Sequence, residues 1–382
     1  MAMCMGPEAI TIDRTRTAAP RAVRADRTAC LVIGLLAGAS AHAVGPADST
    51  ALRGLRVAAF VDVYFAYDFG HSRDDERPRF LYPYDRHSEV DLNLGLLQVA
   101  YDRPRTRAAL GVMAGTYAQA NLIAEPDLLR HVFEARVGLA LDRRRTLWLD
   151  AGIMPSHIGL ESAIGIDNWT LTRSIAAENS PYYMSGAKLT WTAHPKWEVA
   201  AVYLNGWQRI RRVQNDTPCL GTQLVWRPKD GLTLNWSTFA GSDVPDSLGL
   251  YRAFSNLFGT WTRGGWGVQA GVDVGVQEAR GTGPLETWWT PLLIVRRQLG
   301  ERVRLVARAE HYADPDQVIL STGTVHGFTT MGYSLGCDVR VVDEVWARSE
   351  VRTFHGVDAI YDSIHGPVQD NTSITVSVAA RF

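Results

Sequence analysis

Charged side chains that can act on ions or charged solutes gather in two parts of the chain. The segment 155–181 carries three carboxylates and one arginine, Glu161, Asp167, Glu178 and Arg173. Nearer the C-terminus, arginines recur in two pairs with four-residue spacing, Arg304, Arg308, Arg348 and Arg352. Fixed charges that line a narrow passage set its preference for cations or anions. These eight residues are therefore the first candidates for a functional site.

Histidine-based chemistry finds less support. His157 and Glu161 lie four residues apart, as two ligands of a metal ion can, but they lie in a predicted loop and no third ligand accompanies them. Ser156 beside His157, together with His326, would suit a hydrolase, yet Gly-x-Ser-x-Gly and other nucleophile motifs are absent. We therefore predict no catalytic residue, no metal site, no cofactor and no enzyme activity.

The charge balance bears on the class of partner. The 382 residues include 39 Lys and Arg against 40 Asp and Glu, for a formal net charge of -1. Such a chain is not basic enough to predict a nucleic-acid partner. Aromatic residues are more informative, since 12 Trp and 13 Tyr are the side chains favoured where apolar and wet surroundings meet.

The elements that must position the charged residues read as strands. At the C-terminus, apolar residues occupy every second position from Ile374 to Phe382, and mostly polar residues from Ser373 to Arg381 occupy the alternate ones. Residues 303–312, 333–340 and 90–96 alternate in the same way. Period-two alternation predicts a strand with one apolar face. Both a stacked β-sandwich and a membrane barrel with lipid outside and water inside fit this pattern.

The connections between strands favour the barrel. We predict about sixteen strands, with fourteen as the alternative, near 57–67, 88–101, 106–118, 129–141, 146–154, 182–192, 196–205, 219–228, 231–240, 250–262, 265–277, 286–298, 302–312, 330–341, 344–354 and 371–382. Short joins of two to four residues alternate with long joins at 68–87, 119–128, 155–181, 206–218, 241–249, 278–285, 313–329 and 355–370. Antiparallel outer-membrane barrels show this asymmetry, with short periplasmic turns and long outer loops. A sandwich has no reason to maintain it.

The N-terminal segment 1–43 reads as a signal peptide. Five arginines between Arg14 and Arg27 precede the short apolar run 29–39, and Ala41-His42-Ala43 offers a cleavage pattern. A membrane anchor is the alternative, but the run is shorter than the ~20 residues that a spanning helix needs. The barrel then occupies 44–382. It retains Cys219 and Cys337, which we predict to be unpaired because Cys337 lies in a lipid-facing row.

Tryptophans near strand ends are typical of the aromatic girdles that flank the apolar band of a membrane barrel. We assign to these girdles Trp148, Trp197, Trp261, Trp288, Trp289 and Trp346. For any single one of them, an ordinary core tryptophan is the alternative.

Three sequence stretches carry a family resemblance. They read MPSHIGLESAIGIDNWTLTRSIAAENSPYY at 154–183, LNGWQRI at 204–210 and GTQL at 221–224. With these, the chain from about Phe60 to Phe382 resembles the β-barrel porins of the OmpL-like class. The resemblance implies a bacterial outer-membrane location, contact with membrane lipid and a porin role, but it supplies no ligand residues. The terminal Phe382 resembles the signal read by the barrel-assembly machinery.

A sixteen-strand barrel encloses an aqueous lumen. In classical porins the third outer loop folds into the lumen and narrows it, and the corresponding join in this chain is 155–181. We expect Asp167 to cap a short helix that begins at Asn168. We also expect the carboxylates of this loop to face the arginine wall across a constriction for small hydrophilic solutes or ions. Mutual neutralisation of the lumen charges, without selectivity, is the alternative. At the level of function, the alternative is a structural or adhesive barrel that binds a partner through its outer loops, with its lumen closed. The sequence leaves open the solute, the charge preference and whether the protein is a monomer or an oligomer.

Overall fold

The computed structural model describes residues 54–71, 74–279 and 283–382. The predicted signal peptide 1–43 and the first residues of the predicted barrel segment lie outside the described residues. Within the described part, no helix is long and apolar enough to cross a membrane.

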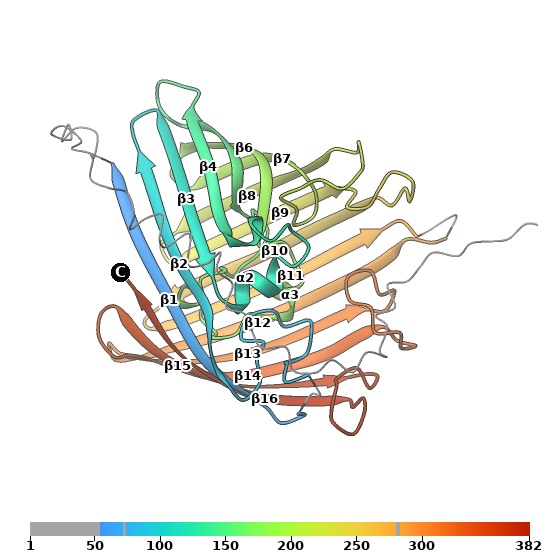
Figure 1. The fold of residues 1–382 in the computed structure, drawn as a ribbon. Coiled ribbons are helices and arrows are strands. Elements are labelled where there is room, and N and C mark those ends of the chain that lie inside the picture. Colours follow the sequence, from blue (N-terminus) through green and yellow to red (C-terminus); the bar gives the residue numbers. More distant parts are fainter. Residues whose placement is uncertain (1–53, 72–73, 280–282) are drawn as a thin grey trace, which may run out of the picture. The chain divides into compact units, whose positions relative to one another are not determined.

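The described chain forms one closed antiparallel barrel (Figure 1). Its strands are β1 Leu55–Asp68, β2 Val90–Asp102, β3 Thr106–Ala114, β4 Val132–Ala140, β5 Leu147–Pro155, β6 Tyr183–His194, β7 Trp197–Leu204, β8 Cys219–Lys229, β9 Leu232–Gly241, β10 Arg252–Arg263, β11 Trp266–Gln277, β12 Glu286–Leu299, β13 Val303–Asp314, β14 Phe328–Arg340, β15 Val345–Gly356 and β16 Asp370–Arg381. Each strand pairs with its neighbours in the sequence, and β16 pairs with β1 to close the ring. The prediction of an all-β barrel is confirmed, with sixteen strands rather than fourteen.

Alternation along the strands separates the two faces of the barrel wall. In β16, Ser373 and Thr375 are each 1% exposed and point inward, whereas Val376 and Val378 are 40% and 56% exposed and point outward. The outward row needs lipid to cover it, and the inward row meets other polar groups. The sequence pattern of strands therefore fixes which side chains can reach the lumen.

Short and long joins lie at opposite ends of the barrel, as predicted. The short joins are 103–105, 141–146, 195–196, 230–231, 264–265, 300–302 and 341–344, and they lie at the end where the chain terminates. All eight joins at the other end have eight or more residues. The backbone of Phe382 exchanges hydrogen bonds of 2.9 and 3.2 Å with that of Ala59, which places the end of the chain against β1.

One strand is shorter than its alternation predicts. The expected strand 106–118 ends at Ala114, and helix α2, Thr116–Asn121, follows directly. Gly115 between them has a φ of 118°, in the region that favours glycine, and the position of a Cβ atom would clash with the backbone of Asn93. The chain therefore turns into the lumen at Gly115. The expected strand 129–141 likewise starts late, since η1, Leu129–His131, precedes β4.

Three long joins fold into the barrel, and we name them loop 1 (69–89, of which 72 and 73 are not described), loop 2 (115–131) and loop 3 (156–182). Loop 1 brings Phe80 within 4.7 Å of the Phe328 ring centroid, and loop 2 buries Tyr117. Loop 3 contains η2, Gly165–Asp167, and helix α3, Ile175–Glu178, and both Leu171 and Ile175 are fully buried. The sequence placed only loop 3 in the lumen.

The six tryptophans assigned to the girdles fall into two groups, those at outward-facing and those at inward-facing strand positions. Trp197, Trp261 and Trp289 are 37%, 37% and 46% exposed on the outer face, in agreement with a girdle. Trp346 is only 7% exposed because it pairs with the inward-facing Ala379, so its assignment to a girdle is wrong. Trp148 and Trp288 also face inward, so their assignments to a girdle are wrong as well. Trp148 lies beneath the guanidinium of Arg107, and Trp288 is 1% exposed.

Candidate functional site in the barrel lumen

Two long basic side chains and two carboxylates form a buried network on the inner face of β13 and β15. Arg308 lies 2.6 Å from Glu350, and Arg352 lies 2.6 Å from Glu310. Arg308 also lies 3.2 Å from Glu310, and all four side chains are at most 1% exposed. Two positive and two negative charges leave the network neutral. Since a buried charge is costly without a partner, this balance is what allows the network to exist.

The strand between them explains how these side chains meet. β14 places small residues opposite the network, with Gly332 beside Glu310 and Ser334 between Arg308 and Arg352. A Cβ atom at Gly332 would lie 2.8 Å from the side chain of Glu310. The small residues on β14 therefore give the arginines of β13 and β15 room to reach across it.

Arg348 forms a second neutral pair one step nearer the short turns. Its Nε donates to Asp338 over 2.8 Å, and the two residues are cross-strand neighbours on β14 and β15. Arg348 is 4% exposed and Asp338 is 2% exposed. The wall thus holds three buried arginines matched by three buried carboxylates.

Loop 3 is bound directly to this wall. Arg308 donates to the carbonyl oxygen of Thr172 over 2.7 Å and to its hydroxyl over 3.0 Å, while Glu350 accepts from the backbone N–H of Thr172 over 2.7 Å. Glu310 accepts from the N–H of Ile175 over 2.7 Å. Hydrogen bonds to charged groups contribute about 1.5–3 kcal/mol each, so loop 3 is strongly held.

Arg348 anchors the preceding turn of the loop. Its guanidinium donates to the carbonyl oxygens of Gly165 at 2.6 Å, Asn168 at 3.1 Å and Trp169 at 3.2 Å. Arg352 adds a 3.3 Å hydrogen bond to the hydroxyl of Thr172. The arginines of the wall therefore recognise the backbone of loop 3, whose carbonyl groups they satisfy.

The carboxylates of loop 3 have other partners. Glu161 accepts from the N–H of Ser174 over 2.9 Å, and also from the hydroxyl groups of Ser174 and Thr170. Asp167 lies 2.8 Å from Arg381. The expected arrangement, with these carboxylates facing the wall arginines across an open passage, is not the one observed, because the guanidinium groups contact the loop itself.

Glu178 and Arg173 hold loop 3 to loops 1 and 2. Arg173 lies 3.4 Å from Glu178, and its guanidinium lies 3.5 Å from the ring centroid of Tyr182 and 5.4 Å from that of Tyr117. Glu178 also accepts from the N–H of Tyr82 over 3.2 Å. Burial raises the pKa of Glu178, and the charge of Arg173 opposes that rise. These contacts join the three inserted loops into one body inside the barrel.

Two further expectations are corrected by position. Asp167 does not cap a helix, since η2 ends at Asp167, and α3 begins only at Ile175 with Ser174 as its cap, whose hydroxyl accepts from the N–H of Ala177 over 3.2 Å. Arg304 lies apart from loop 3. It donates to Gln298 over 3.1 Å and stacks 4.0 Å from the ring centroid of Trp346, half-buried towards the short turns.

His157 does not serve as a metal ligand in this arrangement. Its Nε2 lies 2.8 Å from the carbonyl oxygen of Thr238, and burial lowers the pKa of His157 to about 4. Throughout the described ranges, no group of three or more His, Cys, Asp and Glu side chains could hold a metal ion. Cys219 and Cys337 are both free, as predicted.

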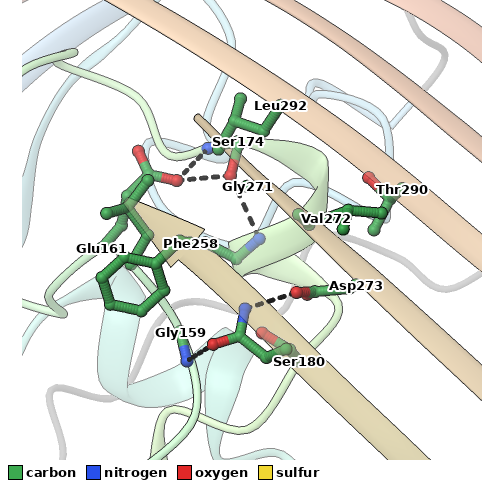
Figure 2. Close-up of a pocket in the computed structure, with 14 residues that line it drawn as sticks. Gly159, Glu161, Ser174, Ser180, Phe258, Gly271, Val272, Asp273, Thr290 and Leu292 are labelled. Carbon is green, nitrogen blue, oxygen red and sulfur yellow. Dashed lines mark hydrogen bonds between the residues drawn. The ribbon is translucent and has the colours of Figure 1, made fainter. Parts of the chain in front are cut away.

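A pocket remains between loop 3 and the inner face of β10, β11 and β12 (Figure 2). Asn256, Asp273, Thr290 and Leu292 line it from the strands, and 159–161 and 174–180 contribute to the opposite side. Its cavity volume is about 20 Å³, enough for one particle the size of a water molecule. Gly271 on β11 leaves this side of the wall without a side chain. The sequence analysis missed the pocket, because polar residues at alternate strand positions signal only an inward face.

The closed sixteen-strand barrel with an apolar outer row, polar inner rows and an inserted third loop defines a porin-like outer-membrane β-barrel. Its fold is similar to that of an anion-selective porin from Comamonas acidovorans, at a TM-score of 0.57 and 11% identity over 86% of this chain and 99% of that one. The fold is also similar to that of the outer membrane channel DcaP of Acinetobacter baumannii, at a TM-score of 0.59 and 7% identity over 86% of this chain and 97% of that one. A third similar structure is that of in-vitro folded OmpT of Vibrio cholerae in its trimer form, at a TM-score of 0.55 and 8% identity over 86% of this chain and 99% of that one. These identities show the fold alone.

Residues 54–382 match the model of the family described as "Putative beta-barrel porin-2, OmpL-like", and the chain belongs to that family. It is therefore a porin-family protein of the bacterial outer membrane and not an enzyme. No curated protein matches the sequence.

Proposed function

We propose that this barrel is a pore for passive diffusion of small hydrophilic solutes and ions across the outer membrane, with loop 3 as its constriction. The observation that carries the proposal is the crossing of the lumen by loop 3. Gly159 near its start donates to Asn256 on β10 over 3.3 Å, and Thr172 near its middle is bound to Glu350 on β15. A segment fixed to two separate parts of the wall narrows whatever passage remains.

The eight charged residues have different roles in this proposal. Arg308, Arg348 and Arg352 anchor loop 3 to the wall, and their charge is matched by the buried carboxylates. Glu161, Arg173 and Glu178 fix the internal shape of the loop. Arg304 and Asp167 lie towards the short turns, where solutes leave the constriction. Because the arginines are occupied by the backbone of loop 3, permeating solutes do not pass between the loop and the arginines.

A closed barrel that binds a partner through its outer loops is the second candidate. Loops 1 and 2 also fill the lumen, and the pocket beside loop 3 is small, which favours this reading. Against it, Arg304 and Lys188 point inward and are half-buried, and their side chains donate to the neutral side chains of Gln298 and Gln223, while the described residues form no ion pair of 4 Å or less with either of them. Inward charges of this kind need water, and a sealed barrel would have to pair them.

Single-channel recording in a planar bilayer tests the proposal. The parent barrel should conduct, and deletion of 160–176 should raise the conductance because it removes the crossing segment. Deletion of 245–248, in a surface join on the same side, is the matched control and should leave the conductance unchanged. A parent barrel without conductance, whose deletion of 160–176 then opens a pore, would favour the closed barrel.

The proposal includes the route to the membrane. Phe382 is 70% exposed and continues the outward row of β16. We expect the barrel-assembly machinery to recognise this residue and outer-membrane lipid to cover the apolar outer rows.

A further inference from the structure

Asp273 is a buried carboxylate with a single hydrogen-bond partner among the described residues. It is 5% exposed on the inner face of β11, and the side-chain amide of Asn256 donates to it (Figure 2). No described lysine, arginine or histidine forms an ion pair with it, in contrast to Asp338, Glu310 and Glu350 on the other side of the lumen. An ionised carboxylate without a compensating charge is costly in such a place. Asp273 therefore needs either a proton or a cation.

Thr290 supplies a second unsatisfied group in the same pocket. Its side chain is 2% exposed, it lines the pocket, and its hydroxyl oxygen has no hydrogen-bond partner among the described atoms. A buried polar atom without a partner is uncommon and calls for an explanation. An oxygen atom of this kind is also a suitable ligand for a hard cation.

The sheet register brings these groups together. Asn256 on β10 is the cross-strand neighbour of Asp273 on β11, and Asp273 is the neighbour of Thr290 on β12. Side chains at directly opposed positions have Cβ atoms about 4.5–5.5 Å apart. The carboxylate and the hydroxyl thus lie in one row across three strands, facing the same pocket (Figure 2).

The other carboxylate in the pocket is already engaged. Glu161 accepts hydrogen bonds from the N–H and hydroxyl of Ser174 and from the hydroxyl of Thr170. The charges of Arg173 and Arg308 also act on Glu161. Asp273 is therefore the carboxylate of the pocket that lacks a compensating charge, and one monovalent cation neutralises it. The absence, in the described ranges, of three clustered acidic, His or Cys side chains argues against a divalent metal ion.

We infer that the pocket between loop 3 and strands β10–β12 binds one monovalent metal cation, Na⁺ or K⁺, with Asp273 and Thr290 as ligands. Asn256 is a positioning residue, since it donates to Asp273 and accepts from the N–H of Gly159. The cavity of about 20 Å³ admits one such ion and excludes organic cations. The inference concerns binding and goes beyond the proposed function, because it applies equally to a conducting and to a closed barrel.

Thermal unfolding of the purified, folded barrel in detergent tests the inference. Midpoints are compared in NaCl, KCl and N-methyl-D-glucamine chloride at equal ionic strength, with added urea if the barrel does not melt. A cation that binds only the folded state raises the midpoint in a saturable way. The parent protein should therefore unfold at a higher temperature in Na⁺ or K⁺ than in the large organic cation.

Two variants locate the site. Asp273→Asn should remove the difference between the cations, and Thr290→Val should raise the half-saturating concentration by roughly tenfold, the loss of one ligand contact. Asp127→Asn is the matched control, because its side chain is 95% exposed and it should respond to the cations as the parent does.

Three results overturn the inference. Equal midpoints of the parent protein in all three salts would mean that Asp273 carries a proton instead. A cation response that persists in Asp273→Asn would place the bound ion elsewhere. If Asp273→Asn does not fold, Thr290→Val replaces it as the test. A half-saturating cation concentration that is the same in Thr290→Val as in the parent would also place the bound ion elsewhere. A parent barrel that binds Na⁺ but does not conduct would refute the pore and leave this site in place.

Discussion

The separation of Arg308 from Arg304 gives the sharpest test of how loop 3 is held. The two arginines lie four residues apart on the inner face of β13. Arg308 makes hydrogen bonds of 2.7 and 3.0 Å to Thr172 and one of 2.6 Å to Glu350, whereas Arg304 contacts Gln298 and Trp346. Replacing each by methionine removes the same charge from the same strand, so only the contacts differ.

The expected magnitude follows from these contacts. Arg308→Met leaves Glu350 buried without one of its basic partners and removes two anchors of loop 3. Breaking a buried ion pair by removing one partner costs about 3–5 kcal/mol. If this cost falls on the docked state of the loop, the ratio of undocked to docked loop rises roughly a hundredfold to a few thousandfold. Arg304→Met is expected to leave this ratio within about twofold of the parent, since the cost of a half-exposed residue is small.

Limited proteolysis with trypsin measures this ratio. The bond after Arg173 is protected while loop 3 is docked, because Arg173 is 2% exposed. When opening and closing are fast, the cleavage rate follows the population of the open form. Arg308→Met should therefore be cleaved after Arg173 much faster than either the parent or Arg304→Met, and it should conduct more current in a planar bilayer. Equal cleavage and conductance of the two variants would refute the anchoring role of Arg308.

Three further outcomes follow from the strand parity. An epitope inserted at Asp246 should be labelled on intact cells and one at Lys229 should not, since their joins lie at opposite ends of the barrel; the opposite labelling would contradict an outward position of the long joins. Ala307→Arg should reduce the surface yield measured by immunoblotting, because a lipid-facing arginine near the middle of the membrane costs roughly 2–4 kcal/mol; full yield would argue against a lipid-facing position. Mass spectrometry after alkylation without reductant should find Cys219 and Cys337 as two thiols, and a linked peptide pair would contradict the register of β14.

The interior also shows why a charged row in the sequence is a poor guide to selectivity. Arg308, Arg348 and Arg352 occupy inward positions, as their alternation predicts, yet their charges are cancelled by buried carboxylates from the same wall. The balance matters because a neutral network exerts little net field on an ion at a distance. Any charge preference of the lumen must come from groups outside the network, such as Arg304 and Asp273.

Local chain properties determined the strands, their faces and the alternation of short and long joins. A strand has period two, so each residue's side is set by its neighbours in sequence, and Gly115 shows the limit of this rule. There a glycine ends the alternation of 106–114, and the buried packing of Tyr117 and its neighbours favours a helix over a continued strand.

Tertiary structure alone decided what the inward charges contact. Thr172 meets Glu350 across 178 residues of chain, and the small residues Gly332 and Ser334 on a third strand make room for this meeting. Sequence spacing gives the direction in which a side chain points, but the partner at the end of that direction comes from a distant segment. For the same reason, the sequence alone does not distinguish Asp273 from other inward polar residues, whereas the closed barrel shows that no described lysine, arginine or histidine forms an ion pair with it.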